Sequence, residues 1–400
     1  MKLLFVVPQL TGIGGIQASL LNLLHELGPD THDVSVCVFG NHISADTDLP
    51  ASVHLVPGPR LLEYCLADFR SAVGRYSRRE VPLLVAAKVL RRLVGYRRVL
   101  DASLARFRIP GHFDAAIAYA NDIYTDRGFV GGANDIVRRS ASARRRIAWI
   151  HNDATKHGLD AARIRRTYGE FDAVVNVSHT CKEIFDAIAP DFAPRSSVVY
   201  NMTDRERILR LAATGDPYDD AEVFRLVTVA RLDNRQKRLD RVIDAAGLLK
   251  DRGVSGFRWY LVGDGPDAAM LRRMALDRQV DDVVRFEGRQ ANPFAYIAHA
   301  DLFVLTSDYE AYGMVLDEAL TLGVPVVCTN YPAASEIITD GENGLLADLT
   351  VESLAETILR AISDPALLRR MRAAIAARPP DNGAATRQFE DVLTGRKVEP

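Results

Sequence analysis

Short apolar runs alternate with longer amphipathic stretches along most of the 400-residue chain. In the first half, the apolar runs that predict strands lie at residues 3–7, 34–39, 115–119, 147–150, 173–177 and 198–200. Between most of these runs the apolar residues recur at helical spacing, as in residues 17–27. Strands that are apolar on both faces and joined by helices predict a parallel sheet covered by helices on both sides.

The second half repeats this plan, with predicted strands at residues 226–230, 259–262, 283–286, 302–305, 325–328 and 345–347. Between the halves, residues 203–222 contain Gly215, Pro217 and four Asp, which predicts a linker. The length agrees with two domains of ordinary size. We therefore expect two α/β units in tandem with a cleft between them, and ligands at the carboxyl ends of their strands.

The composition is that of an ordinary globular protein, with 48% hydrophobic and 26% charged residues. This excludes a disordered chain, a collagen-like fibre and a coiled coil. The four cysteines are too scattered for a disulfide framework or a metal knuckle, which favours a reducing, cytosolic setting. No apolar run approaches the roughly 18 residues that span a bilayer, and the N-terminal apolar run predicts a strand rather than a signal peptide.

The net charge of −2 conceals an uneven distribution. Residues 1–201 carry 25 Lys and Arg against 20 Asp and Glu, whereas residues 202–400 carry 25 against 32. The basic excess is concentrated between Arg70 and Arg108, where 11 basic residues face only Glu80 and Asp101. Such a local excess predicts an anionic partner at one place on the molecule, not nucleic-acid binding in general.

The segment Arg70–Arg108 also contains apolar residues at helical spacing. A basic amphipathic helix can lie on an anionic membrane surface, which would suit a lipid-linked acceptor. The alternative is an insertion whose apolar side packs on the N-terminal domain while its arginines are solvated. The sequence leaves both interpretations open.

Two features of the first half are candidates for ligand contact. A glycine-rich turn that includes Gly14 and Gly15 joins the first strand to a helix, so its amides can approach a phosphate or a sugar; a tight turn is the alternative. His151 directly follows the strand at 147–150, with a hydrogen-bonded structural histidine as the alternative. The second strand ends without the acidic residue of the dinucleotide fingerprint, which disfavours NAD binding.

In the second half, Arg231 and Lys237 follow the strand at 226–230, where paired cations could bind a diphosphate. A solvated basic turn is the alternative. Further along, Glu310 lies in a predicted loop and Glu318 on a helix that begins near Gly313. Carboxylates accept hydrogen bonds from vicinal hydroxyls, which suits sugar recognition, although an exposed loop Glu and a helix Glu are common in any chain.

Glu310 and Glu318, with seven residues between them, resemble the E-x7-E motif of family 4 retaining glycosyltransferases. The resemblance is strong over residues 225–350, loose over residues 42–145, and reaches nearly the whole chain. The further segments that carry it are residues 262–266, 286–288, 292–294, 300–304 and 323–327, the Arg231/Lys237 loop, the glycine turn and His151.

The resemblance implies the GT-B fold, in which two Rossmann-like domains enclose the active site. We expect an N-terminal acceptor-binding domain over residues 1–202, a linker over 203–222 and a C-terminal nucleotide-sugar-binding domain over 223–372. A C-terminal helix and tail over 373–400 would pack back on the N-terminal domain. The family usually works without a bound metal, and the sequence has neither an Asp-x-Asp at a strand end in a plausible site nor a His/Cys cluster, so we expect no metal and no cofactor.

The resemblance also implies a role for each matching residue of the second half. Glu318 would bind the ribose hydroxyls, and Glu310 the hydroxyls of the donor sugar. Arg231 and Lys237 would neutralise the diphosphate. They would be helped by the amides at the helix start, those of Gly313, Met314 and Val315.

Three further roles follow from the same resemblance. The nucleotide base would lie near Arg289 and Gln290. His151 would face the transferred sugar, and Gly14 and Gly15 would approach the donor. Ala311 stands where many family members have Gly, so the loop of Glu310 is less free to adopt positive φ.

The implied activity is transfer of a hexose or N-acetylhexosamine from a nucleotide-diphosphate sugar, UDP favoured over GDP, to a glycan or lipid-linked acceptor. Transfer would retain the anomeric configuration by a front-face route, as in bacterial surface-polysaccharide assembly. We expect a cytoplasmic protein, peripheral at the inner face of the plasma membrane. The alternatives are a nucleotide-sugar epimerase or a phosphorylase of the same fold, and a non-catalytic sugar-binding partner of another transferase.

Overall fold

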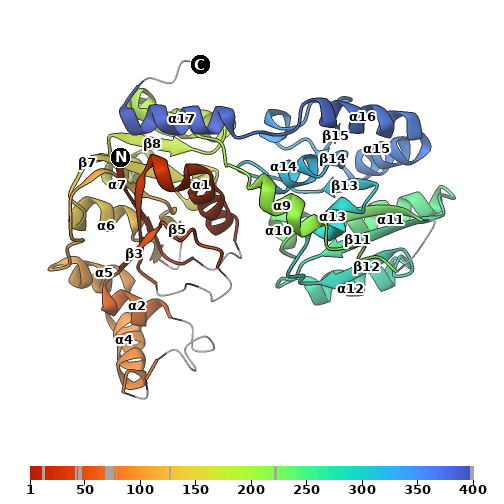
Figure 1. Ribbon diagram of the computed structural model, residues 1–400. Helices are drawn as coiled ribbons and strands as arrows, with labels where there is room; N and C mark the ends of the chain where they lie inside the picture. Colours follow the sequence, from red (N-terminus) through yellow and green to blue (C-terminus); the bar gives the residue numbers. More distant parts are fainter. Residues whose placement is uncertain are drawn as a thin grey trace. The chain divides into compact units, whose positions relative to one another are not determined.

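A computed structural model of the chain describes residues 1–10, 14–40, 43, 47–67, 76–77, 79–125, 128–219 and 223–396. The chain forms two compact units. Unit 1 comprises Met1–Met202 together with Gly383–Pro400, and unit 2 comprises Thr203–Asn382. Each unit contains a parallel sheet flanked by helices (Figure 1).

The sheet of unit 1 has seven parallel strands in the order β3-β2-β1-β4-β7-β8-β9. Its strands are β1 (Lys2–Val7), β2 (Asp33–Val38), β3 (His54–Pro57), β4 (Phe113–Ala118), β7 (Ala143–Ile150), β8 (Ala173–Asn176) and β9 (Ser196–Val198). A short antiparallel pair, β5 (Ile123–Thr125) and β6 (Gly128–Val130), lies between β4 and β7 in the chain. The strand order reverses between β1 and β4, as in doubly wound folds.

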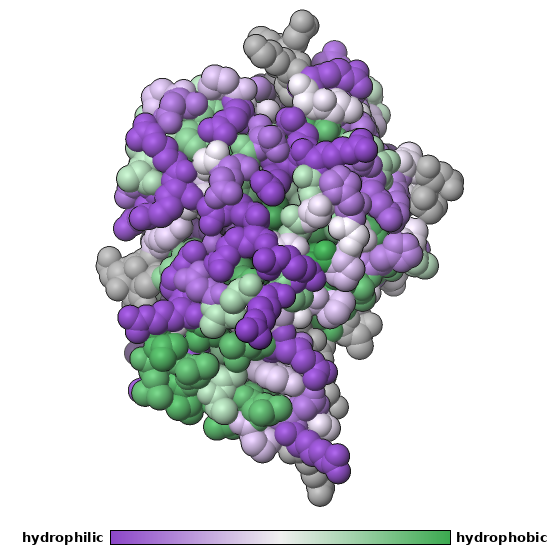
Figure 2. All heavy atoms as spheres, turned by 90° about the vertical axis from the view of Figure 1, so that its left-hand side faces the viewer, coloured by the Kyte–Doolittle hydropathy of each residue, from purple (hydrophilic) through white to green (hydrophobic). Residues whose placement is uncertain are grey.

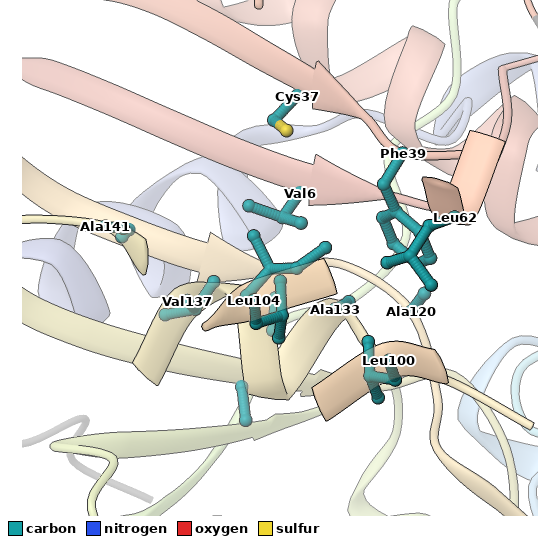
Figure 3. Packing of buried hydrophobic residues seen from close by; sticks show 14 of the residues in the cluster. Val6, Cys37, Phe39, Leu62, Leu100, Leu104, Ala120, Ala133, Val137 and Ala141 are labelled. Carbon is teal, nitrogen blue, oxygen red and sulfur yellow. The ribbon is translucent and has the colours of Figure 1, made fainter. Parts of the chain in front are cut away.

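Helices cover this sheet and bury its apolar faces. They are α1 (Gly15–Thr31), α2 (Arg60–Leu66), α4 (Val81–Val94), α5 (Tyr96–Leu104), α6 (Ala133–Ser140), α7 (Ala161–Tyr168) and α8 (His179–Ile188). Figure 3 shows Val6 from β1, Leu104 from α5 and Val137 from α6 within one buried cluster. The leucines that predicted a helix within residues 17–27 lie on one face of α1 and are buried, namely Leu20, Leu23, Leu24 and Leu27.

The last helix of the chain, α17 (Gly383–Thr394), belongs to unit 1. Its Phe389 is fully buried, stacks on Phe5 with ring centroids 6.4 Å apart, and lies 6.0 Å from the ring of Trp149. Arg145 Nε donates a hydrogen bond of 2.7 Å to the carbonyl of Val392. The returning segment therefore begins at Gly383, ten residues later than the expected boundary at residue 373, and residues 373–382 remain with unit 2.

The sheet of unit 2 has six parallel strands in the order β12-β11-β10-β13-β14-β15. Its strands are β10 (Phe224–Val229), β11 (Phe257–Val262), β12 (Val284–Gly288), β13 (Leu302–Leu305), β14 (Val326–Thr329) and β15 (Gly344–Ala347). Its helices are α9 (Arg205–Ala212), α10 (Asn234–Lys237), α11 (Asp240–Asp251), α12 (Ala268–Asp277), α13 (Phe294–Ala298), α14 (Met314–Thr321), α15 (Val351–Ser363) and α16 (Pro365–Ala377). The strand order reverses between β10 and β13, so loops after these strands diverge and leave room for a ligand.

The expected linker over residues 203–222 differs from the structure, because it contains α9 and belongs to unit 2. Asp204, one of the four Asp that indicated a linker, caps α9 by accepting a hydrogen bond of 3.0 Å from the amide of Arg207. Ile208 and Ala212 bury the inner face of this helix in the same core cluster as Leu316 of α14. Asp204 therefore marks the start of a helix and not a free connection, while residues 220–222 lie outside the described part of the chain.

Crossing a bilayer requires a long and continuously apolar helix. None of the helices in the described part of the chain meets that requirement.

We expect Phe389→Ala to lower the free energy of unfolding of unit 1 by about 3–5 kcal/mol, because it leaves a cavity in the core. The chain has two tryptophans, Trp149 in unit 1 and Trp259 in unit 2. Denaturant unfolding followed by Trp149 fluorescence in a Trp259→Phe background measures the effect. Arg387→Ala, an exposed position on α17, is the control. Equal midpoints for the two variants would contradict the assignment of α17 to this core.

Candidate active site

An ion pair joins the loops that follow β10 and β13. Lys237 is the last residue of α10, and Glu310 lies between β13 and α14. Lys237 Nζ and Glu310 Oε1 are 2.6 Å apart, and the two side chains are 18% and 11% exposed. Because β10 and β13 are parallel neighbours, their carboxyl ends bring together residues far apart in the sequence.

Two more donors hold the carboxylate of Glu310. Ser307 Oγ donates to Oε1 over 2.6 Å, and Gln236 Nε2 donates to Oε2 over 3.1 Å. Gln236 Nε2 also donates to the carbonyl of Tyr309 over 3.2 Å. The orientation of Glu310 is thus fixed by donors from both loops. Gln236 and Ser307 are site residues that the sequence analysis missed, since neither carries a charge.

The backbone of these loops is fixed by Asp308. Arg238 and the buried Arg241 both pair with its carboxylate, at 3.1 and 2.6 Å respectively. Arg241 Nη1 donates a further hydrogen bond of 2.9 Å to the carbonyl of Thr306. The alternative of a solvated basic turn is therefore wrong for Lys237 and Arg238, which are engaged within unit 2.

Arg231 differs from Lys237 and Arg238 because its side chain is exposed and pairs with no carboxylate among the described residues. Two glycines fix the course of its loop. A Cβ on Gly263 would lie 1.9 Å from the carbonyl oxygen of Ala230, and one on Gly265 would lie 2.4 Å from that of Leu232. The Gly-Asp-Gly segment after β11 therefore allows close backbone approach and sets the position of the Arg231 loop.

Helix α14 begins beside the ion pair. Gly313 precedes it with φ of +106°, and a Cβ there would lie 2.4 Å from Tyr331 Oη, which donates to the carbonyl of Tyr312 over 3.0 Å. The amides of Met314 and Val315 occupy the first turn, where a helix offers no carbonyl partner. This end of the helix carries partial positive charge close to Lys237 and Glu310.

Glu318 lies on α14, about one turn from its start. Its pKa is raised to about 7, mainly by burial and then by the charge of Asp317, while Arg207 and Lys237 oppose the shift. Burial also raises the pKa of the adjacent Asp317 to about 6. Glu318 is thus a half-buried carboxyl that titrates near neutral pH.

Arg289 and Gln290 follow β12 at the same edge of the sheet. Arg289 is exposed, and Gln290 Nε2 donates to the carbonyl of Glu287 over 2.7 Å. Strand β11 separates β12 from β10, so these residues lie further along the edge from Lys237. The structure therefore gathers Lys237, Glu310 and the start of α14 closely, and places Arg289 and Gln290 at a distance.

In unit 1, Gly14 forms the N-cap of α1 and Gly15 begins the helix, while residues 11–13 lie outside the described part. The φ of Gly14 is −133°, which any residue adopts. A Cβ on Gly15 would meet nothing within 4 Å, so its surface is open.

His151 follows β7, at the carboxyl edge of the unit 1 sheet. Its amide donates to Asn121 Oδ1 over 2.8 Å, and its ring lies 4.4 Å from the ring of Tyr119. Burial lowers its pKa to about 3, so the imidazole is neutral at pH 7. Its Nε2 atom is buried and has no hydrogen-bond partner among the described residues.

Across the described ranges, no three His, Cys, Asp or Glu side chains are arranged to hold a metal ion.

Residues 219–378 match the model of the family described as glycosyl transferases group 1. The chain is 27% identical over 264 residues to N-acetyl-alpha-D-glucosaminyl L-malate synthase of Bacillus anthracis, covering 65% of this chain and 67% of that protein. It is 32% identical over 176 residues to the lipopolysaccharide core biosynthesis glycosyltransferase LpsE of Rhizobium meliloti, covering 44% of this chain and 49% of LpsE. The matched stretch thus spans about half the length of LpsE.

Solved structures share the fold over the whole chain. Anabaena HepE in complex with UDP and glucose has a TM-score of 0.66 at 20% identity, covering 98% of this chain and 99% of that one. WaaG, a glycosyltransferase involved in lipopolysaccharide biosynthesis, has a TM-score of 0.62 at 18% identity, covering 98% and 100%. These likenesses confirm the expected GT-B fold class.

The raised pKa of Glu318 makes stability depend on pH. Between about pH 4.5 and 7 the folded unit holds a proton on Glu318 that the unfolded chain releases. Protonation of Glu318 therefore stabilises the fold; this contribution is fully present below about pH 4.5 and is lost as the pH rises through about 7. Glu318→Gln cannot ionise and so does not lose this contribution. We expect its free energy of unfolding to rise by about 1–3 kcal/mol relative to that of the parent when the pH is raised from 5 to 8.

Chemical denaturation at the two pH values measures this gain. Glu342→Gln, in an exposed loop, is the control. A difference between Glu318→Gln and the parent that stays constant with pH would contradict the raised pKa.

Proposed function

We propose that this chain, a glycosyltransferase that belongs to the group 1 family through residues 219–378, transfers a hexose or N-acetylhexosamine from a UDP-sugar to a glycan or lipid-linked acceptor. The observation that carries the proposal is the Lys237–Glu310 pair beside the start of α14, with Arg231 exposed between β10 and Lys237. Two observations support the nucleotide-sugar chemistry: LpsE and WaaG are glycosyltransferases of lipopolysaccharide biosynthesis, and HepE binds UDP and glucose.

The diphosphate of the donor would bind Arg231, Lys237 and the amides of Met314 and Val315. A nucleoside diphosphate that leaves the sugar gains negative charge, which fixed donors stabilise more than mobile water does. Glu310 and Ser307 support this role, because they hold the Lys237 loop in place before the donor arrives.

The carboxylate of Glu310 would accept hydrogen bonds from donor-sugar hydroxyls, and that of Glu318 from the ribose hydroxyls. Glu318 has a pKa of about 7, and the donor would favour its ionised form as an acceptor. The uracil would lie toward Arg289 and Gln290. In unit 1, the neutral imidazole of His151 would contact the transferred sugar through its unpartnered Nε2, and Gly14 and Gly15 would approach the donor.

The transfer would follow a front-face route with retention. The acceptor oxygen forms its bond to the anomeric carbon on the face from which the diphosphate departs, as the bond from that carbon to the diphosphate oxygen breaks. The acceptor proton passes to the departing phosphate oxygen, so no protein nucleophile is consumed. A trapped glycosyl-enzyme intermediate would contradict this route.

The acceptor would be a glycan or a lipid-linked saccharide, and the protein would work at the cytoplasmic face of the plasma membrane. The basic segment Arg70–Arg108 supports this placement through its charge. Incubation with labelled nucleotide sugars separates transfer to such an acceptor from isomerisation by an epimerase and from binding alone.

UDP-sugars should stabilise the protein most strongly in a thermal-shift panel of UDP-glucose, UDP-galactose, UDP-N-acetylglucosamine and GDP-mannose. A ligand at 100 times its dissociation constant contributes about 2.7 kcal/mol to the folded state. A panel in which GDP-mannose alone stabilises the protein would overturn the preference for UDP.

Lys237→Ala should lower the rate of sugar transfer by about a hundredfold to a thousandfold, because it removes a donor to the leaving group. The control is Lys250→Ala, which removes a lysine of the same unit whose Nζ lies 2.7 Å from the carboxylate of Asp282. Initial rates with radiolabelled donor measure both. Parental turnover in Lys237→Ala would refute the diphosphate assignment.

A further inference from the structure

Helix α4 of unit 1 turns apolar side chains toward solvent. Thirteen large hydrophobic side chains are exposed among the described residues, and six of them belong to this single helix of 14 residues. Their exposed fractions range from 40% to 78%, and the residues are Val81, Leu83, Val85, Val89, Leu90 and Leu93. Figure 2 shows an apolar patch low on the face of unit 1, where α4 lies in Figure 1.

The arrangement is the reverse of an ordinary surface helix. Only Leu84 and Ala87 are buried against the rest of unit 1. Two of its three polar residues instead bond to backbone carbonyls of unit 1: Lys88 Nζ donates to the carbonyl of Ala67, and Arg91 Nη1 donates to that of Cys65 over 3.1 Å. Surface helices of globular proteins normally place their apolar stripe toward the core, so a contiguous exposed patch marks an interaction site.

Exposed cations lie on α4 and next to it in the chain. Arg79 precedes the helix, Arg92 lies on it, and Arg98 follows on α5, all with exposed side chains. The nearest carboxylate in the chain, Glu80, is bound to Ser77 Oγ at 2.8 Å and to Tyr64 Oη at 3.2 Å. An apolar face bordered by arginines is complementary to one environment in particular, the interface of an anionic bilayer, where acyl chains lie below negative headgroups.

A series of contacts connects α5, which follows α4 in the chain, to the carboxyl edge of the sheet. Tyr96, at the start of α5, donates to the carbonyl of Gly131 over 2.6 Å. The amide of Gly132 donates to Asp122 over 3.1 Å, and the adjacent Asn121 accepts from the amide of His151. Helix α5 is therefore linked through these residues to the loop that holds His151.

We propose that α4 lies in the interface of an anionic membrane with its apolar face inserted and Arg79, Arg92 and Arg98 against the headgroups. The membrane contact is then an insertion of the apolar side chains of α4, assisted by the three arginines; residues 70–75 and 78 of the basic segment Arg70–Arg108 lie outside the described part of the chain. The contact does not rest on the donor chemistry proposed above, which the thermal-shift panel tests separately.

Co-sedimentation of the full chain with vesicles tests the insertion. We expect binding to vesicles of phosphatidylcholine mixed with phosphatidylglycerol, and a loss of about tenfold or more in partitioning for the triple variant Leu83→Gln, Leu90→Gln, Leu93→Gln. Glutamine keeps the length and helix propensity of leucine. Leu276→Gln, at a 56% exposed position on α12 of unit 2, should bind as the parent does.

The salt dependence of vesicle binding distinguishes insertion of apolar side chains from electrostatic attraction alone. Raising the salt concentration from about 0.1 M to about 1 M shortens the screening length from about 10 Å to about 3 Å. The parent should retain a measurable fraction of its binding, and the triple variant should retain none. Binding that disappears in salt and is unchanged in the triple variant would overturn the insertion, as would absence of binding by the parent.

Two further measurements exclude other occupants of the face. The parent should be monomeric by light scattering at the concentrations used, and the triple variant should unfold at the same temperature as Leu276→Gln. A dimer that the triple variant dissociates would assign the face to a second copy. A lower unfolding temperature of the triple variant would show that the chain itself covers α4. Either result would overturn the membrane proposal.

Discussion

The ion pair between Lys237 and Glu310 joins two loops whose residues lie 73 positions apart, and the geometry of the candidate active site depends on it. Two further hydrogen bonds join the loops: the side-chain Oγ1 of Thr306 donates to the carbonyl of Lys237, and the amide of Asp308 donates to that of Gln236. Removing water from two charges is costly, and further hydrogen bonds to the carboxylate offset part of that cost. The site is therefore pre-arranged, and a bound diphosphate would draw on a lysine whose position is already set.

The parallel order of the strands explains why this pair forms where it does. The β10 and β13 strands are neighbours at the point where the strand order reverses, and the loops after them carry Arg231, Lys237 and Glu310. The glycines at 263 and 265 keep the loop after β11 in backbone contact with the Arg231 loop, and Gly313 lets α14 start against Tyr331. Gly263, Gly265 and Gly313 lie in segments that carried the family resemblance. At each of them a side chain would collide with the backbone or with the ring hydroxyl of the buried Tyr331.

Strong apolar runs made most of the fold predictable, because buried parallel strands are apolar on both faces. The six strands of unit 2 agree with the predicted ranges to within two residues at either end. Strand β3 was missed because it is an edge strand whose His54, Leu55 and Pro57 are exposed, so it has no continuous apolar run. In the site, charged residues were predictable from their place after strands, whereas Gln236 and Ser307 acquire their role only from the contact with Glu310. In α4, the number of basic residues in the sequence did not predict which way they point. Lys88 and Arg91 donate to backbone carbonyls, whereas six apolar residues face solvent.

The proposed function depends most on one assignment, that Arg231, Lys237 and the start of α14 bind the diphosphate of the donor. Titration calorimetry with UDP and with uridine tests it most directly, since the two ligands differ by the diphosphate alone. We expect UDP to bind the parent far more tightly than uridine does, and Lys237→Ala and Arg231→Ala to weaken binding of UDP but not of uridine. An affinity ratio of UDP to uridine that is the same in the parent and in both variants would contradict it.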